Sequence, residues 1–420
     1  MTVLIKKARI TDPTSSNNNK TLDILIDSGA IREIGSDLSP GTAEIIEGEN
    51  LHVSPGWVDI FSNFCDPGYE FKETLSSGAE AAAAGGFTDV FVIPNTKPVV
   101  DNKSQVEYIR SSAHHSATIH PIGAVSRNTE GKDLAEMYDM RNSGAIAFSD
   151  GTTPVQSAGL MLKALQYVKA FDGVVIQIPD DKSVGSNGLM HEGVASTRLG
   201  LAGKPLMAEE LLVARDIKLT RYTESRLHFT GVTSPRSLEY IRRAKDAGLN
   251  VTCSVAPHYL YFIDEDLESY DTNLKVYPPL RSRTEQNALK QAVKDGTIDC
   301  IASHHMPHEY DSKVLEFEYA KNGMIALETC YACLKTAMPE VDDSRWVELL
   351  SINPRKIFGL EINSVDINSP AALTIFSPVG STNIDSSFFR SKSRNSAFIG
   401  KELNGKAIGT IRGQKVFIRK

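Results

Sequence analysis

Eight short apolar runs, each followed by a longer segment with helical periodicity, constrain the fold of this chain more than any other feature. The runs are apolar throughout instead of alternating, which is typical of strands buried on both faces of a parallel sheet. They start at "WVDIFSN" and "TDVFVIP" and finish at "VTCSV" and "CIASH", with helical segments such as "LMLKALQYVKAF" and "SLEYIRRAKDAG" between them. Eight consecutive strand–helix units predict an α/β fold of the (β/α)8 type, a TIM barrel of about 250 residues or more.

The two ends of the chain have a different pattern. Roughly the first fifty residues alternate short apolar runs with turn signals, as in "VLIKKARI" and "LDILID", and the last sixty do the same in "AALTIFSP" and "QKVFIRK". This pattern predicts short strands joined by turns. We therefore expect residues 1–52 and 363–420 to build one small β-sandwich domain together, and residues 53–362 to form the barrel domain.

Composition excludes several classes of protein. Of the 420 residues, 41% are hydrophobic and 23% are charged, which is ordinary for a globular protein. The net charge of −7 offers no basic surface for nucleic acid or anionic lipid. The apolar run in "MTVLIKKARITDP" is too short for a signal peptide, and no stretch approaches the roughly 20 apolar residues of a membrane span. Because the five cysteines are scattered, we expect a cytoplasmic protein without a disulfide framework.

The candidate site is the set of residues that end the predicted strands, because catalytic groups of such barrels lie at the carboxyl ends of their strands. The first strand ends at Phe61 and Asn63. These two residues are two positions apart, so their side chains share a face, and we expect both to point into the barrel mouth. The fourth, fifth, sixth and eighth strands end at Asp150, Gln177, Gly231 and His304.

Several blocks of sequence match one known family in order. They include "SPGWVDIFSNFCDPGYEFKET", "GGFTDVFVIPNTKPV", "GAIAFSDGT", "VAPHYL", "YPPLRSR", "DGTIDCIASHHMPH" and "INPRKIFGL". With these blocks the chain resembles a dihydroorotase of the cyclic amidohydrolase group, in the amidohydrolase superfamily, over nearly its whole length. The resemblance implies a zinc enzyme of pyrimidine biosynthesis that interconverts carbamoyl-aspartate and dihydroorotate. In that family the metal polarises an amide carbonyl and lowers the pKa of a bound water.

This chain departs from the family at the metal site. The family's strand-one, strand-five and strand-six histidines, and the aspartate that acts as general base on strand eight, are replaced, and only the strand-four carboxylate is kept. Phenylalanine and glycine offer no side-chain donor, and amides are weak zinc ligands. We therefore expect no metal and no cofactor here. The six positions now hold Phe61, Asn63, Asp150, Gln177, Gly231 and His304, with His304 at the general-base position.

Two of the four positions that the resemblance assigns to substrate binding keep the family's residue. By the resemblance, the arginine that holds the substrate carboxylate falls on Cys65, and an asparagine falls on Tyr277. A thiol cannot replace a bidentate guanidinium. Asn95 and His308 are kept as the remnant of a substrate-binding site.

Other patterns in the sequence leave further interpretations open. The cluster "HHMPH" could build a metal site of a new kind from His304 and Asp150, although local packing is favoured. Cys330 and Cys333 have the spacing of a redox or zinc pair, but a single pair inside a predicted helix favours core packing. Cys65 has no base beside it in sequence that would make it a nucleophile.

Three hypotheses follow. The favoured one is a dihydroorotase-like protein without catalytic activity that acts as a structural or regulatory partner of aspartate carbamoyltransferase in a homo- or hetero-oligomer, as the resemblance implies for inert relatives. The second is an active dihydroorotase, or another cyclic amidohydrolase of hydantoin or allantoin type, with a rearranged site built on Asp150, His304, His308 and Asn95. The third is a subunit that senses a carbamoyl-amino acid in the remnant pocket.

Overall fold

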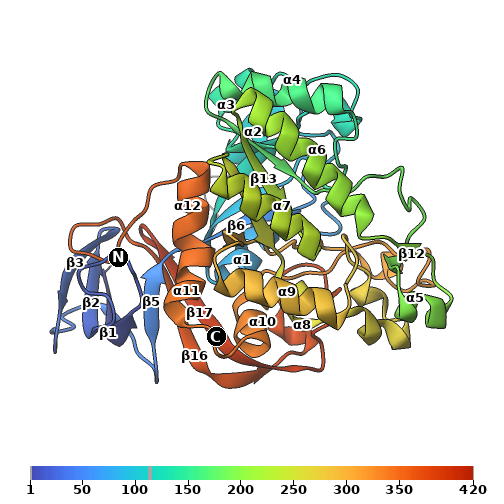
Figure 1. Cartoon of the computed structure of the whole chain (residues 1–420). Coiled ribbons are helices and arrows are strands. Elements are labelled where there is room, and N and C mark those ends of the chain that lie inside the picture. Colours follow the sequence, from blue (N-terminus) through green and yellow to red (C-terminus); the bar gives the residue numbers. More distant parts are fainter. Residues whose placement is uncertain (1, 112–115, 420) are drawn as a thin grey trace.

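The computed structural model describes residues 2–111 and 116–419 of the chain. Its central element is a parallel sheet of eight strands in the order β15-β14-β13-β10-β9-β8-β7-β6 (Figure 1). The backbone N–H of Asn63 donates to the carbonyl oxygen of His305 over 2.9 Å, which brings the two edges of the sheet together. The predicted barrel of eight strands is therefore confirmed as a nearly closed one. The strands are β6 (Trp57–Ser62), β7 (Phe87–Val92), β8 (Thr118–Gly123), β9 (Ala147–Phe148), β10 (Val174–Gln177), β13 (Arg226–Thr230), β14 (Val251–Val255) and β15 (Cys300–Ile301).

Helices cover the outside of this barrel. Three of the predicted ones begin at a serine whose side chain accepts a backbone N–H of the first turn: Ser157, Ser234 and Ser282. Such caps satisfy donors that have no partner inside a helix. The helices are α1 (Leu75–Ala84), α2 (Lys103–Ser111), α3 (Met137–Ser143), α4 (Ala158–Lys169), α5 (Val194–Leu199), α6 (Met207–Thr223), α7 (Pro235–Asp246), α8 (Pro257–Tyr261), α9 (Arg283–Lys294), α10 (Cys330–Ala337), α11 (Asp343–Val347) and α12 (Asn353–Phe358).

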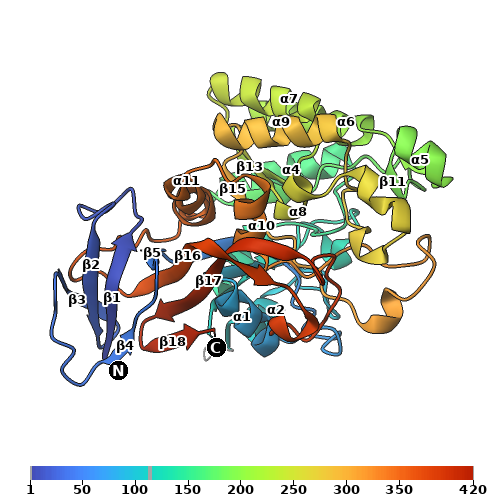
Figure 2. The same cartoon turned by 90° about the horizontal axis from the view of Figure 1, so that it is seen from below.

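The two ends of the chain share one mixed sheet beside the barrel (Figure 2). The N-terminal part contributes β1 to β5 and the C-terminal part contributes β16 to β18, and the antiparallel pairing of β5 with β16 joins them. Apolar side chains from both ends, among them Ile5 and Leu373, form a separate core within this sheet. The strands are β1 (Thr2–Ile10), β2 (Thr21–Asp27), β3 (Ala30–Gly35), β4 (Glu44–Ile46), β5 (His52–Pro55), β16 (Ala372–Asn383), β17 (Glu402–Arg412) and β18 (Lys415–Ile418).

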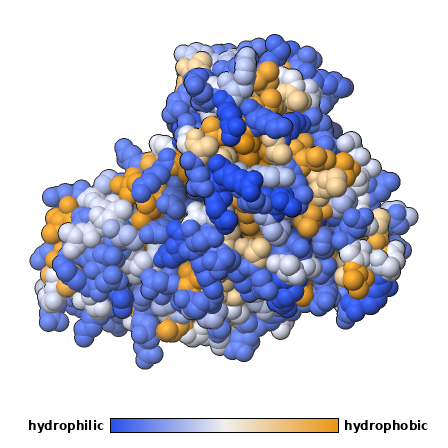
Figure 3. Space-filling model, in the orientation of Figure 1, coloured by the Kyte–Doolittle hydropathy of each residue, from blue (hydrophilic) through white to orange (hydrophobic). Residues whose placement is uncertain are grey.

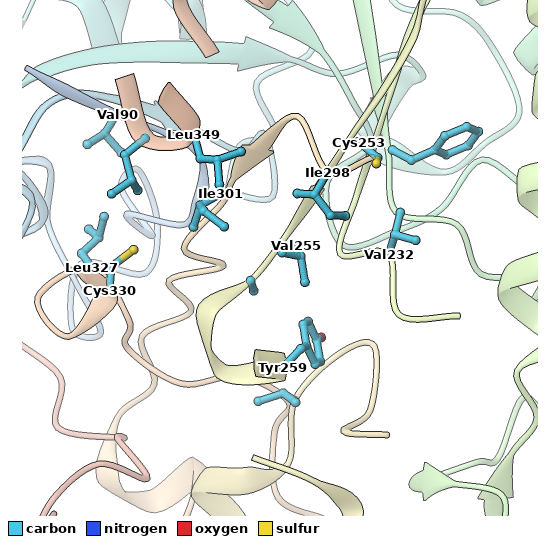
Figure 4. Packing of buried hydrophobic residues seen from close by; sticks show 14 of the residues in the cluster. Val90, Val232, Cys253, Val255, Tyr259, Ile298, Ile301, Leu327, Cys330 and Leu349 are labelled. Atoms are coloured by element: carbon cyan, nitrogen blue, oxygen red, sulfur yellow. The ribbon is translucent and has the colours of Figure 1, made fainter. Parts of the chain in front are cut away.

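A second, larger core fills the space between the barrel strands and their helices. Figure 4 shows part of it, including Val255 and Ile301 of the barrel wall and Cys330 of α10, which lies beside Leu327. Cys330 and Cys333 are free thiols buried in this helix, which confirms the prediction that they pack in the core. The outer face drawn in Figure 3 is largely hydrophilic with scattered apolar residues. Within residues 2–111 and 116–419, none of the helices combines the length and apolar character of a membrane span.

Candidate functional site

A cavity of about 520 Å³ opens at the carboxyl ends of the barrel strands. The segments after β6, β7, β9, β10, β14 and β15 all contribute to its walls, so it lies where barrels of this kind place their ligands. Four of the ten predicted site residues, namely Phe61, Asp150, Gln177 and Gly231, are not part of its lining. The other six do line it: Asn63, Cys65, Asn95, Tyr277, His304 and His308.

The end of β6 places its two predicted residues differently. Phe61 is fully buried in the apolar interior of the barrel, together with Ile60 and Phe91. Phe61 does not itself line the cavity, because its ring is covered by the imidazole of His304, which does. Asn63 does reach the cavity, and its Oδ1 accepts the backbone N–H of Cys65 over 2.8 Å.

His304 is held by contacts on three sides. Its ring lies 4.8 Å from that of Phe61, centroid to centroid. Its Nε2 lies 2.8 Å from the hydroxyl oxygen of Thr230. On the third side is Gly231, where an added Cβ would lie only 2.7 Å from Cε1 of His304. Burial lowers the pKa of His304 to about 3, so the imidazole is neutral at physiological pH.

Asp150 and Gln177 make hydrogen bonds to the backbone beside the cavity. The Oδ1 of Asp150 accepts the backbone N–H groups of Val125 and Ser126 over 2.9 and 2.8 Å. Burial raises the pKa of Asp150 to about 6 although these hydrogen bonds oppose the shift. The side-chain amide of Gln177 pairs with the backbone of Val155, both accepting and donating at 3.3 Å. The polar atoms of both side chains are thus used within the protein.

The two residues predicted to remain from a substrate-binding site also form hydrogen bonds within the protein. Asn95 donates from Nδ2 to the carbonyl oxygen of Asp150 over 3.1 Å. His308 donates from Nε2 to the carbonyl oxygen of Asn322 over 2.9 Å, and burial lowers its pKa to about 4. Burial also raises the pKa of the Cys65 thiol to about 12, which excludes a thiolate nucleophile at neutral pH.

Sequence reasoning missed a charged cluster in the wall of the cavity. The Nζ of Lys204 lies 2.8 Å from Oδ2 of Asp180, and the Tyr277 hydroxyl donates to the same oxygen over 2.5 Å. Asp180 follows the fifth strand, so its position at a strand end was a usable signal. Lys204 carried no such signal, because it lies in a two-residue strand, β12 (Gly203–Lys204), paired only with β11 (Met190–His191).

His258 was missed as well. It lies at the start of α8, directly after the seventh strand, and lines the cavity. Both ring nitrogens are buried and have no hydrogen-bond partner within the described part of the chain. Burial lowers the pKa of His258 to about 3, so the ring is neutral. Unpaired buried polar groups are uncommon, which marks this position as a place where a ligand or water would be bound.

The barrel and its terminal sheet form the fold of solved hydantoinases, and sequence relatives place the chain in the cyclic amidohydrolase class. L-Hydantoinase from Arthrobacter aurescens has the same fold, with a TM-score of 0.87 at 24% identity over 100% of this chain and 96% of that one. The family model described as dihydro-orotase-like matches residues 51–237. The dihydroorotase of Geobacter metallireducens is 41% identical to this chain over 100% of both chains. That of Syntrophus aciditrophicus is 40% identical to it over 98% of both chains. The chain belongs to the dihydroorotase family, as its sequence blocks predicted.

Proposed function

We propose that this chain is a dihydroorotase-family protein of pyrimidine biosynthesis that has no zinc centre, does not turn over dihydroorotate, and acts as a structural or regulatory partner of aspartate carbamoyltransferase. The place in pyrimidine biosynthesis is supported by full-length relatives that carry the name dihydroorotase. The loss of catalysis is supported by one observation above all. The strand ends that would hold a metal carry side chains that have no ligand atom, as in Phe61 and Gly231, or whose polar groups make hydrogen bonds within the protein; among the described residues at these positions, His304 Nδ1 is a nitrogen left without a partner.

The donor chemistry of these positions does not fit zinc, which binds thiolate, imidazole or carboxylate, usually four ligands in total with water. Phe61 and Gly231 contribute no donor. The carboxylate of Asp150 is held by backbone N–H groups, and His304 Nε2 lies within hydrogen-bond distance of the Thr230 hydroxyl. Removing these groups from their present partners would leave buried N–H and O–H groups unsatisfied.

The replacements also depend on one another. His304 fills the space beside residue 231, because even a Cβ at Gly231 would lie 2.7 Å from its ring. The ring of Phe61 packs on another part of the same imidazole. A histidine at position 231 therefore requires His304 to move from its present position. This mutual fit supports a site adapted to be without metal, in contrast to one that has lost a single ligand.

A working enzyme with a rearranged site is the second candidate, and the identity of about 40% to proteins named dihydroorotase favours it. It would use Asp150, His304, His308 and Asn95. Three of these line the cavity, but the carboxylate of Asp150 faces the backbone of Val125 and Ser126. An acid and a base held in one pocket are what general acid–base catalysis needs, and this arrangement separates them.

The deciding experiment measures dihydroorotate turnover by the purified chain, with added zinc and after chelation, alongside its bound metal. The Geobacter metallireducens relative serves as the positive control. We expect no turnover and less than stoichiometric zinc in either condition. Turnover that a chelator abolishes would overturn the proposal in favour of the rearranged enzyme.

A separate experiment tests the partnership with aspartate carbamoyltransferase. The chain is co-expressed with aspartate carbamoyltransferase from the same organism, and the two are separated by size-exclusion chromatography at micromolar concentration. Coelution in one complex is expected. Independent migration of the two proteins would overturn the partnership while leaving the loss of catalysis to be judged by the turnover assay.

A further inference from the structure

The loop that follows β15, residues 309–323, carries an unusual group of exposed apolar side chains; we name it the outer loop. Tyr310 and Tyr319 are 77% and 63% exposed, and Val314 and Leu315 lie between them on the same short segment with about half of each side chain in solvent. Single exposed apolar residues are ordinary, but several large ones on one segment mark an interaction site. We infer that the outer loop is the docking surface for a protein partner whose own face has an apolar centre and a basic rim.

The outer loop is held from inside by two buried lysines. The Nζ of Lys275 donates to the carbonyl oxygens of Phe317 and Glu318, over 2.7 and 2.8 Å. The Nζ of Lys313 donates to those of Lys321 and Gly323, over 2.7 and 3.0 Å. Four backbone carbonyls of one loop are therefore fixed by hydrogen bonds from two buried lysine side chains. A loop fixed in this way presents its tyrosines with little conformational entropy left to lose on binding.

The charge around these apolar side chains selects the partner. The outer loop carries four acidic residues, Glu309, Asp311, Glu316 and Glu318, whereas its exposed cation is Lys321. Asp311 and Glu316 form no ion pair with any residue that the structure describes. A basic rim on the partner would complement them, and such complementarity sets orientation and association rate. A second copy of this chain fits poorly, because a two-fold contact would place one acidic loop against another.

The position of the outer loop connects docking to the cavity. Asn322 and Gly323, at the end of the loop, line the cavity, and Glu309 at its start lies 3.6 Å from Nζ of Lys72. Lys72 also lies 5.7 Å from the ring of Phe71, another exposed aromatic residue. In Figure 2 the orange outer loop lies on the opposite side of the molecule from strands β1 to β4. A partner bound there would cover the entrance to the cavity and leave the terminal sheet free.

This inference rests on the proposed partnership with aspartate carbamoyltransferase, and that protein is the probe. The double variant Tyr310→Ser/Tyr319→Ser removes the two aromatic anchors, since tyrosine is enriched among residues that dominate binding energy. The matched control is Tyr222→Ser at the end of α6, where the side chain is 74% exposed. Titration of each variant against the transferase should give a loss of roughly tenfold or more for the double variant and less than about twofold for the control.

The charges are tested separately with Glu316→Lys/Glu318→Lys. This variant should weaken binding, and raising the salt concentration should weaken binding of the native chain more than binding of the variant. Unchanged melting temperatures establish that the variants are folded. If the native chain and the double tyrosine variant bind equally, the docking surface is overturned but the proposed partnership stands. If the native chain does not bind the transferase, the docking surface and the partnership are both overturned. If the tyrosines instead mediate dimerisation of the chain, the proposal of a partner with a basic rim is overturned.

Discussion

The rings of Phe61 and His304 stack at the bottom of the barrel mouth, with their centroids 4.8 Å apart and their planes inclined by 35°. By the family resemblance, both residues were expected at positions that serve the metal in relatives. Their contact joins the first strand of the barrel to the eighth, near the point where Asn63 and His305 close the sheet. These two residues thus contribute to packing in this chain.

The first prediction concerns the stability supplied by Phe61. Replacing it with alanine removes a fully buried ring and leaves a cavity, so we expect the free energy of unfolding to fall by about 3 to 5 kcal/mol. Denaturant unfolding with and without a chelator measures this loss. Phe71→Ala, at a ring that is largely exposed, should change stability by less than about 0.5 kcal/mol. A small loss at Phe61, or a loss seen only in the presence of chelator, would contradict a packing role.

The second prediction concerns Gly231, which has a φ of +70° and lies against His304. Gly231→Ala should destabilise the chain by about 2 kcal/mol or more, because the backbone is strained for alanine and the new Cβ meets the imidazole. His304→Ala removes the steric part, so the double variant should lose less than the sum of the two single losses. Denaturant unfolding of all four proteins closes this cycle. Strict additivity would mean that the two positions are independent.

Much of the fold was predictable because local pattern determines it. Each barrel strand is a continuous apolar run bounded by turns, and three of the predicted helices begin at a capping serine, so the eight units could be identified without knowing their neighbours. The joining of the two termini through β5 and β16 was also predictable from their alternating strands. The pairing itself joins distant segments, but the strands and helices depend on residues close together in sequence.

The contacts within the site were less predictable because they join distant positions. Tyr277 was expected only as a lost substrate contact, but its hydroxyl reaches Asp180, 97 residues earlier in the chain. Lys204 enters the same cluster from a strand too short to give a sequence pattern. The inward packing of Phe61 likewise depends on the size of neighbouring side chains in the closed barrel. Such relationships follow from strand register and loop paths, which the local sequence does not determine.

The third prediction concerns the charged cluster around Asp180. Lys204→Met removes the ammonium and leaves the buried carboxylate of Asp180 with the Tyr277 hydroxyl as its remaining partner in this cluster, so we expect the free energy of unfolding to fall by about 3 kcal/mol or more. Replacing both partners, as in Lys204→Met/Asp180→Leu, removes the unpaired charge and should recover part of that loss. Thermal and denaturant unfolding measure both variants. A double variant less stable than Lys204→Met would contradict this account of the pair.

The last prediction concerns pH and His258. Its pKa is lowered to about 3 by burial, whereas an unfolded histidine titrates near 6.5. The unfolded state therefore binds a proton first as the pH falls, so the stability that neutral His258 contributes is complete above about pH 6.5 and is lost progressively toward pH 3.

His258→Asn removes this titration. Because neither ring nitrogen has a hydrogen-bond partner in the described structure, the substitution breaks no hydrogen bond there. Between pH 6 and 4 the native chain should lose about 1.4 kcal/mol per pH unit more than the variant. Denaturant unfolding across this range measures the difference, and parallel stability curves would show that His258 is not buried as a neutral imidazole.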